Sequence, residues 1–447
     1  MYERYAGLVN KNKRIIYDTI DYIWENPELG YKEWKTSEYL AEKFEMLGYS
    51  VKRADDIPGF AAELDTGIPG PKVAVMGELD AIRCATHPAA NPETQAVHAC
   101  GHHIQTAAML GIAAAFKEAG ATEGLCGSIR FIAVPAEETI DLGYRESLIS
   151  NGIISYVAGK TEFLKRGYFD DVDMAMMFHA DSGENGLFRF IDGQNGCVTK
   201  HFEYRGKAAH AGAAPHKGIN ALYAASIGLA ACNSLRETFR ERDYIRYHPI
   251  INQGGVAANA IPDIVSMDTY VRAASFDAMI EANRKINRAI AASAVSLGAN
   301  VRIMDKPGNF PFLSDKNLSE RAAAVIEELF GQDKIEYSGW DTQSSDVGDI
   351  SSLMPVIQHY CKGASGEQHG NNYFIKDRDK TAINSAIVIS CLIYDILKEN
   401  GTFGRKVIAE YTPVFKSREE YFEAINKISC DMNLVEYSGN HEAKIYF

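Results

Sequence analysis

Four side chains that can bind a metal ion lie within six consecutive positions of the sequence. They are His98, Cys100, His102 and His103. Thiolate and imidazole are ligands that zinc prefers, and a nearby carboxylate widens the choice to manganese. Gly101 separates Cys100 from His102, so the backbone can bend enough to direct both side chains at one ion. The segment predicts a metal site, although an isolated Cys-Gly-His is more often a polar loop around a buried cysteine.

An adjacent pair of carboxylates, Glu137 and Glu138, follows an apolar run over 129–134 that is typical of a buried strand. Adjacent carboxylates repel each other, so a buried pair needs a nearby cation or must take up a proton. With a metal ion present, one carboxylate can bind the ion while the other takes a proton from metal-activated water. The pair therefore favours metal-assisted hydrolysis, and the alternative is an exposed acidic turn.

Four further polar residues stand near the ends of apolar runs or in loops of small residues. They are Asp80, His179, His210 and His369. Asp80 and His179 follow runs that are typical of buried strands. His369 lies between glycines, where its imidazole could complete the ligands of a metal, and His210 lies among alanines, where it could contact a ligand. A lone histidine in either place is more often a core, rim or turn residue.

The hydrophobic pattern predicts an α/β fold that would bring such residues together. Two amphipathic helices are expected over 12–24 and 36–47, and another over 105–117. Short apolar runs alternate with helical segments, as in a parallel sheet that is covered on both faces. These runs are 73–76, 129–134, 172–178 and 356–360. Ligand sites in such sheets lie at the carboxyl ends of the strands, so the polar residues that follow three of the runs point to one crevice.

A different order of elements, β-α-β-β-α-β, is predicted between about 198 and 305 and is typical of a ferredoxin-like unit. We therefore predict a discontinuous first domain over 1–195 and 309–400, interrupted by an inserted domain over 196–308. Residues 401–447 form a C-terminal extension without an assigned role.

Composition excludes several classes of protein. Of the 447 residues, 46% are hydrophobic and 23% are charged, as in globular rather than disordered or collagenous proteins. The net charge of −13 disfavours nucleic acid and anionic membranes as partners. The longest apolar stretch that we identify, over 107–116, is too short to span a membrane. The eight cysteines are scattered and contain no CxxC pair, so we expect a cytoplasmic protein without a disulfide framework.

Six motifs occur in one order and together resemble a known family. They are His98-Ala-Cys-Gly-His102, Pro135-Ala-Glu-Glu138, Phe178-His179, Ala209-His-Ala211, Gly255-Val-Ala-Ala-Asn259 with Ile261-Pro-Asp263, and Asp346-Val-Gly-Asp349. Over about 10–400 the chain is similar to the amidohydrolase branch of the aminoacylase and glutamate-carboxypeptidase metallopeptidase family. That branch includes auxin-conjugate, hippurate and aminobenzoyl-glutamate hydrolases. Many members read Cys-Gly-His-Asp-x-His, whereas this chain has His103 and Gln105, and in these details it resembles the aminobenzoyl-glutamate hydrolases most.

The resemblance implies a catalytic α/β domain with a mixed, mostly parallel sheet flanked by helices. It implies that the inserted ferredoxin-like domain is a lid and dimerisation domain, so that a homodimer is expected. It also implies two divalent metal ions per subunit, with zinc or manganese preferred over cobalt or nickel. The implied ligands are Cys100, His102, Glu138, His179 and His369, with the Cys100 thiolate as the bridge.

The remaining implied roles concern proton transfer and substrate binding. Glu137 is the implied general base, and Asp80 is a candidate to orient His102. His210, Asn259 and Arg272 are implied to bind the carboxylate of a small substrate or the developing oxyanion, with His210 acting across the dimer.

The predicted function is hydrolysis of the amide bond of a small N-acyl or N-aroyl amino acid by metal-activated water, with Glu137 as the base. A dipeptidase or carboxypeptidase with the same site is the nearest alternative. A second alternative is a non-catalytic protein that binds metal or an amino-acid conjugate, which the two glutamates disfavour because a binder needs no free base. A third is an enzyme with Cys100 as its nucleophile.

Overall fold

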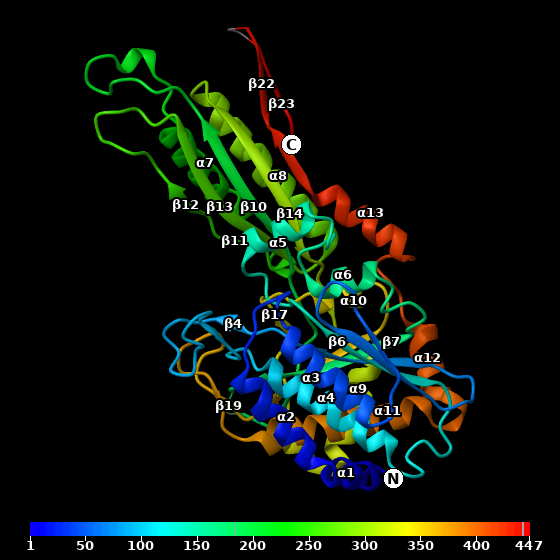
Figure 1. The fold of residues 1–447 in the computed structure, drawn as a ribbon. Coiled ribbons are helices and arrows are strands. Elements are labelled where there is room, and N and C mark those ends of the chain that lie inside the picture. The colour runs from blue at the N-terminus through cyan, green and yellow to red at the C-terminus, as the bar shows by residue number, and fades with distance from the viewer. Residues whose placement is uncertain (184, 440–441) are drawn as a thin grey trace. The chain divides into compact units, whose positions relative to one another are not determined.

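The computed structural model describes residues 1–183, 185–439 and 442–447, and the chain divides into two compact units (Figure 1). The first unit comprises Met1–Asp192, Leu313–Asp341 and Asp349–Val414. The second unit comprises Gly193–Phe312, Thr342–Gly348 and Phe415–Phe447. The first unit is therefore built from distant parts of the chain, and the C-terminal residues belong to the second unit.

Eight strands form the mixed sheet of the first unit. β3 (Lys72–Glu78) lies between parallel β6 (Ser128–Val134) and parallel β7 (Met174–Asp181), and β7 pairs in parallel with β18 (Val356–Lys362). Antiparallel pairs join β1 to β2, β2 to β6 and β18 to β8. The order is β1-β2-β6-β3-β7-β18-β8-β16. The remaining strands are β1 (Val51–Arg53), β2 (Phe60–Asp65), β8 (Phe188–Phe190) and β16 (Ile335–Tyr337). The predicted mixed, mostly parallel sheet is confirmed.

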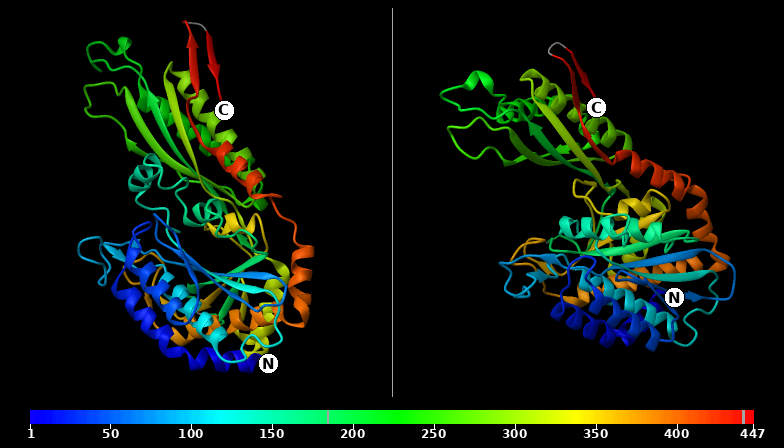
Figure 2. Two further views of the ribbon diagram at one scale, coloured as in Figure 1. Left: turned by 45° about the vertical axis from the view of Figure 1, so that its right-hand side comes forward. Right: turned by 45° about the horizontal axis from the view of Figure 1, so that its top comes forward.

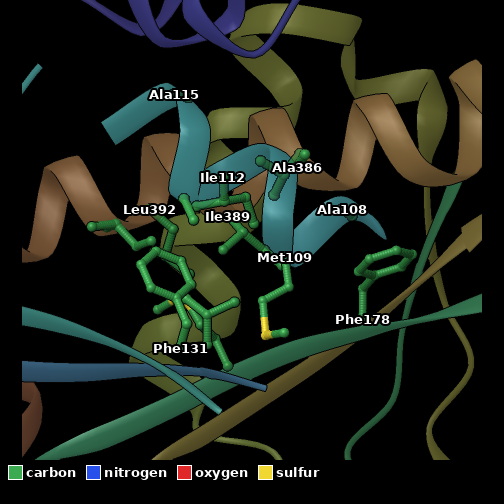
Figure 3. Close-up of a cluster of buried hydrophobic side chains, with 14 of the residues drawn as sticks. Ala108, Met109, Ile112, Ala115, Phe131, Phe178, Ala386, Ile389 and Leu392 are labelled. Atoms are coloured by element: carbon green, nitrogen blue, oxygen red, sulfur yellow. The ribbon is translucent and has the colours of Figure 1, made fainter. Parts of the chain in front are cut away.

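Helices pack on this sheet through apolar side chains. α4 (His102–Lys117) is buried from His102 to Phe116 and contacts β3 and β7, and α11 (Asn384–Leu397) packs against α4. Figure 3 shows Met109 and Ile112 of α4 among Phe131 of the sheet and Leu392 of α11. The other helices are α1 (Tyr2–Lys11), α2 (Lys13–Glu25), α3 (Trp34–Met46), α5 (Leu142–Ser150), α6 (Gly159–Lys165), α9 (Lys316–Phe330) and α12 (Thr402–Glu410).

Some element boundaries differ from the sequence prediction. The helix expected from residue 105 begins at His102, so His102 and His103 lie in its first turn. The strand expected over 172–178 spans Met174–Asp181, so His179 lies within β7 rather than after it. α1 was not predicted, because only Tyr5 and Val9 of its ten residues are buried and its apolar pattern is short.

One helix of the first unit is long and apolar enough to cross a membrane. It spans Asp379–Leu397, where a π-helical turn leads into α11, and 83% of its most apolar 18-residue window is buried. The sequence predicts a core helix over 382–398, in which Asn384, Ser385 and Ser390 interrupt the apolar residues. Its burial against α1, α4 and α9 is that of a core helix.

The second unit contains the predicted β-α-β-β-α-β order. Its elements are β10 (Gly196–Arg205), α7 (Ala221–Ser234), β11 (Arg246–Tyr247), β12 (Ile250–Gln253), β13 (Ile264–Ala273), α8 (Phe276–Ser296) and β14 (Asn300–Asn309). β10 lies between β13 and β14 in antiparallel register, and α7 and α8 pack on these strands. The second strand of this order is divided into β11 and β12, because Pro249 lacks the amide hydrogen that a continuous ladder needs.

The C-terminal segment extends the sheet of the second unit. α13 (Arg418–Ile428) leads into β21 (Cys430–Asn433), which pairs antiparallel with β14. The hairpin of β22 (Val435–Ser438) and β23 (Glu442–Ile445) contacts α8, and Figure 2 shows this red segment beside α8. β21 therefore covers the β14 edge, and β11 and β12 form the opposite edge of the described sheet.

A charged network is buried in the second unit. The side chains of Lys200 on β10 and Asp305 on β14 are 0% and 1% exposed, and their charged atoms lie 2.5 Å apart. The Lys200 ammonium donates to Asn283 of α8 at 2.6 Å, and the Asn283 amide donates to Asp305 at 2.9 Å. Burial lowers the pKa of Lys200, and the facing carboxylate opposes that shift. The network joins both strands to α8.

Lys200→Met is expected to destabilise the second unit by about 3–5 kcal/mol, because it leaves the Asp305 carboxylate buried without its cation. Urea titrations followed by circular dichroism measure the free energy of unfolding. Lys285→Met on α8 is the matched control, since the Lys285–Glu281 pair lies at the surface and should contribute less than about 1 kcal/mol. An equal loss of unfolding free energy in the two variants would contradict the argument that burial makes the Lys200–Asp305 pair important.

Candidate metal centre

The loop between β5 (Ala96–Val97) and α4 places Cys100 and His102 next to each other in the interior. Gly101 has a φ of +92°, and a Cβ at this position would lie 2.7 Å from the Tyr373 hydroxyl and 3.0 Å from the Ala180 methyl group. Glycine is therefore required by both the conformation and the available space. Cys100 and His102 are 4% and 1% exposed, so the loop holds two ligand types away from bulk water.

Cys100 contacts side chains from two distant segments. Its Sγ lies 3.4 Å from Nε2 of His179, and the Gln368 amide donates to it at 3.1 Å. Nδ1 of His179 lies 2.9 Å from the carbonyl oxygen of Ala180 and donates to it, because a carbonyl can only accept. This bond orients the ring and leaves Nε2 facing the thiol.

His102 is oriented by the loop after β3. Its Nδ1 lies 2.9 Å from the Asp80 carbonyl oxygen and 3.2 Å from an Asp80 carboxylate oxygen, so Nδ1 is the donor. Its Nε2 is buried, makes no hydrogen bond with the described residues and lies 3.2 Å from a Glu78 carboxylate oxygen. A buried imidazole nitrogen of this kind, held beside a carboxylate, suits a metal ligand.

Glu138 and His369 complete the cluster from the first and the last segment of the first unit. Glu138 Oε1 lies 2.8 Å from His369 Nε2. His369 adopts a φ of +64°, and its backbone N–H donates to the Ala99 carbonyl at 2.9 Å, which attaches its loop to the Cys100 segment. Burial and the Cys100 charge raise the pKa of Glu138 to about 7, while hydrogen bonds to Cys100 and Glu138 raise the pKa of His369 to about 11.

The five predicted ligands form overlapping groups whose donor atoms lie within 4.8 Å of one another. The groups are Cys100 with His102 and His179, Cys100 with Glu138 and His369, and His102 with Glu137 and Glu138. Because Cys100 belongs to two of these groups, its sulfur is placed so that it could bind two ions at once. The structure also brings Glu137 to this cluster, and Asp80 contacts both His102 and the backbone N–H of Glu138, at 2.9 Å for the latter.

The electrostatics of the cluster fit a cation. Burial raises the pKa of Cys100, but the charges of His102 and His179 outweigh burial and hold this pKa well below its usual range. Burial lowers the pKa of His102, but the charges of Cys100 and Glu78 raise it well above the usual value. Both shifts favour a thiolate beside protonated histidines in the metal-free cluster, and divalent ions can replace such protons. The donor set of thiolate, imidazole and carboxylate suits borderline transition metals.

Two buried residues near the cluster were not identified as a pair from the sequence. The Lys160 ammonium of α6 and the Glu78 carboxylate lie 2.5 Å apart, with side chains 0% and 2% exposed. Burial raises the pKa of Glu78, but the charges of Lys160 and His102 outweigh it and lower the pKa. Glu78 follows an apolar run, but the sequence has no local signal for Lys160, because its partner lies 82 positions away. Gln368 was missed for the same reason.

Three predicted substrate-binding residues lie in the second unit. Nδ1 of His210 accepts the backbone N–H groups of Gly212 and Ala213 at 3.2 and 3.1 Å, so Nε2 carries the proton and can donate. Asn259 is exposed, and its carbonyl accepts the N–H of Ala211 at 2.9 Å, which places it beside His210. Arg272 lies on β13, where its guanidinium is 4.6 Å from the Tyr270 ring and its Nε is buried without a hydrogen bond to the described residues.

Comparisons with known proteins identify a family model, related sequences and a related fold. Residues 74–393 match Peptidase family M20/M25/M40. The chain is 31% identical over 253 residues to a p-aminobenzoyl-glutamate hydrolase polypeptide of Escherichia coli (strain K12), and the match covers 55% of this chain and 48% of that relative. The aligned region thus spans about half the length of that relative.

Two further comparisons extend over most of the chain. It is 27% identical over 377 residues to hippurate hydrolase of Campylobacter jejuni, covering 80% of this chain and 90% of that protein. The solved structure of a dinuclear metal-binding peptidase of the M20 family from Bacillus subtilis has the same fold, with a TM-score of 0.65 and 18% identity, covering 88% of this chain and 99% of that one.

Proposed function

The chain belongs to Peptidase family M20/M25/M40, and from this premise we propose that it is a metal-dependent hydrolase that cleaves the amide bond of small N-acyl or N-aroyl amino acids. The observation that carries the proposal is the position of Glu137, whose carboxylate lies in one donor group with His102 and Glu138. A carboxylate beside the ligands that is not needed as a ligand can act as a base.

We propose that two divalent ions bind at the cluster, zinc or manganese in preference to cobalt or nickel. Cys100, His102, Glu138, His179 and His369 would hold them, with the Cys100 sulfur shared. When bound, the ions lower the pKa of water and polarise the scissile carbonyl. Asp80 fixes the tautomer of His102, and the Ala180 carbonyl fixes that of His179, so that each presents Nε2 to the cluster.

Glu137 is the proposed general base. Its carboxylate would accept a proton from the attacking water and return it to the nitrogen of the leaving amine. Arg272, Asn259 and the Nε2–H of His210 would bind the substrate carboxylate or the developing oxyanion. Because Nδ1 of His210 is occupied by two backbone donors, its Nε2–H is already a donor before substrate arrives.

A substrate panel on protein reconstituted with zinc or manganese tests the proposal, with release of free amino acid as the readout. We expect hydrolysis of N-benzoyl, aminobenzoyl and N-acetyl amino acids, complete inhibition by a chelator and recovery when metal is added. Preferred cleavage of free dipeptides would assign a dipeptidase with the same site. Stoichiometric binding of these compounds without product would identify a binding protein and overturn the proposed activity.

We also propose that the enzyme works in the reducing cytoplasm. Its eight cysteines are free thiols, and Cys100 among them must stay reduced to bind metal.

We infer that two chains associate through the second unit. Tyr223 and Ile227 of α7 are 62% and 41% exposed and lie one helical turn apart, and Ile250 on the edge strand β12 is 52% exposed. An exposed apolar stripe in the same unit as an unpaired strand edge is typical of a surface that is covered by a partner.

The double variant Tyr223→Lys/Ile227→Lys is expected to be a monomer, because two ammonium groups cannot be desolvated in an apolar interface. Light scattering after gel filtration should give twice the 49.3 kDa chain mass for the wild type and the single mass for the variant. Ile68→Lys in the first unit is the control, because Ile68 is 51% exposed and should leave the mass unchanged. A wild-type mass of one chain would overturn the inference.

A further inference from the structure

A fully buried arginine lies behind the turn that carries the two glutamates. Arg145 is 0% exposed, and its guanidinium donates to the carbonyl oxygens of Val157 at 2.7 Å, Ala136 at 3.4 Å and Glu138. We propose that Arg145 is a positioning residue that holds the backbone of 135–138, so that Glu137 is kept at the base position and Glu138 at the ligand position. This inference rests on the proposed roles of those two glutamates.

The opposite side of the same turn is held by two buried carboxylates. Glu33 accepts the N–H of Ala136 at 2.8 Å, and Asp80 accepts the N–H of Glu138 at 2.9 Å. Together with Arg145, these side chains occupy both the N–H and the carbonyl of Ala136 and of Glu138. Every polar backbone group of the two residues that flank Glu137 is therefore bonded to a buried side chain, which leaves the turn little freedom to move.

The turn needs such support because its backbone is strained. Ala136 has a φ of +55°, in the left-handed region that residues with a Cβ rarely adopt. A strained residue keeps its conformation only where many surrounding interactions hold it in place, and such residues cluster at functional sites. Without the bonds on both sides, Ala136 would relax toward an ordinary conformation, and the direction of the Glu137 side chain would change with it.

A glycine creates the space for this arrangement. A Cβ on Gly30 would lie 2.5 Å from Nη2 of Arg145 and 3.1 Å from Cα of Ala136. The guanidinium also lies 5.5 Å from the ring of the adjacent Tyr31. The segment between α2 and α3 therefore forms one wall of the arginine site and also supplies Glu33.

The helix that carries Arg145 is anchored at its start. α5 begins four residues after Glu138, and Asp141 at its N-terminus pairs with Lys32 at 3.3 Å and with Arg83 at 2.9 Å. After the turn at 135–138 the chain enters α5, whose start is held by these ion pairs. Arg145 lies in the first helical turn of α5, and its guanidinium binds back to residues 136 and 138. An arginine suits this role because its five N–H donors in a fixed plane can serve several carbonyls at once.

The experiment compares Arg145→Met and Arg145→Lys in the full chain with the matched control Arg166→Met. Arg166 also donates to a backbone carbonyl, that of Ile153, and its other hydrogen bonds go to Glu162 and Asp56 rather than to 135–138. Two readouts are independent of turnover. They are the Zn²⁺ affinity from competition with a chromophoric chelator, and deuterium exchange of a peptide covering 133–140 in metal-free protein.

We expect Arg145→Met to weaken Zn²⁺ binding by about 10–100-fold, as for other residues that orient metal ligands. Exchange at the Ala136 and Glu138 amides should become at least about tenfold faster. On a hydrolysed substrate kcat should fall with little change in KM, and Arg145→Lys should recover part of each effect. Arg166→Met should change thermal stability without changing Zn²⁺ affinity or exchange at 133–140.

Wild-type exchange and wild-type Zn²⁺ affinity in a folded Arg145→Met would overturn the inference. If Arg145→Met does not fold, Arg145→Lys gives the same test, since it keeps the charge but lacks the planar fork. If the wild type binds Zn²⁺ but hydrolyses none of the amides, the proposed function fails while affinity and exchange still decide the role of Arg145. If all activity is present and neither readout moves, only this inference fails.

Discussion

Glu137→Gln is expected to lower kcat by about a thousandfold while the protein keeps its metal, because the amide cannot accept a proton from water. The substitution preserves the size and shape of the side chain, so the donor group of His102, Glu137 and Glu138 loses only the basic oxygen. Mass spectrometry measures the metal content per chain, and steady-state hydrolysis of a benzoyl or aminobenzoyl amino acid measures kcat.

Glu138→Gln is the control for this prediction. Its carboxylate lies in donor groups with Cys100 and His369 and with His102, so its loss should reduce metal content, and added metal should restore little activity. The two adjacent glutamates would then have different roles, with Glu137 needed for proton transfer and Glu138 needed for metal binding. Near-normal turnover by a metal-loaded Glu137→Gln enzyme would show that the base is another residue.

Cys100→Ser should reduce the affinity for the two proposed metal ions by at least about 100-fold and abolish hydrolysis at micromolar metal, because its sulfur belongs to two donor groups. A serine hydroxyl stays protonated where the thiol ionises readily beside His102 and His179. Isothermal titration of metal-free protein with Zn²⁺ or Mn²⁺ should show two sites in the wild type and none of comparable affinity in the variant.

Cys126→Ser is the matched control, because Cys126 is also buried in the first unit but donates only to the Leu397 carbonyl, a bond that serine can make. It should bind metal like the wild type. Loss of one ion only in Cys100→Ser would show that the sulfur does not bridge. Activity that survives removal of all metal but requires Cys100 would instead support a nucleophilic thiol.

The candidate ligands were identifiable from the sequence where two signals coincide within a few residues. Cys100 and His102 flank a glycine, and Glu137 and Glu138 follow an apolar run, so residue type and local pattern agree. The prediction that strand ends converge on one crevice also follows from the sequence, because parallel strands place their carboxyl ends on one edge of a sheet. His179 shows the limit of this argument, since it lies inside β7 and not after it.

The supporting residues were not identifiable in this way. Lys160 pairs with Glu78, Arg145 binds the turn at 135–138, and Gln368 donates to Cys100. Nothing near these three residues in the sequence distinguishes them from surface residues. A buried polar side chain is recognisable only by its partner. The partners of Lys160 and Gln368 lie 82 and 268 positions away, and Arg145 binds backbone carbonyls, which any residue could supply.

The sequence by itself determined the alternation of strands and helices and the inserted β-α-β-β-α-β unit, and it indicated the candidate ligands, because composition and periodicity are local properties of the chain. Only the tertiary structure decided which donor atoms face one another, which nitrogen of His102 and His179 is left for a metal, and that residues 415–447 add a strand to the second unit. Those features depend on the distances between segments that packing brings together, and separations along the sequence do not specify such distances.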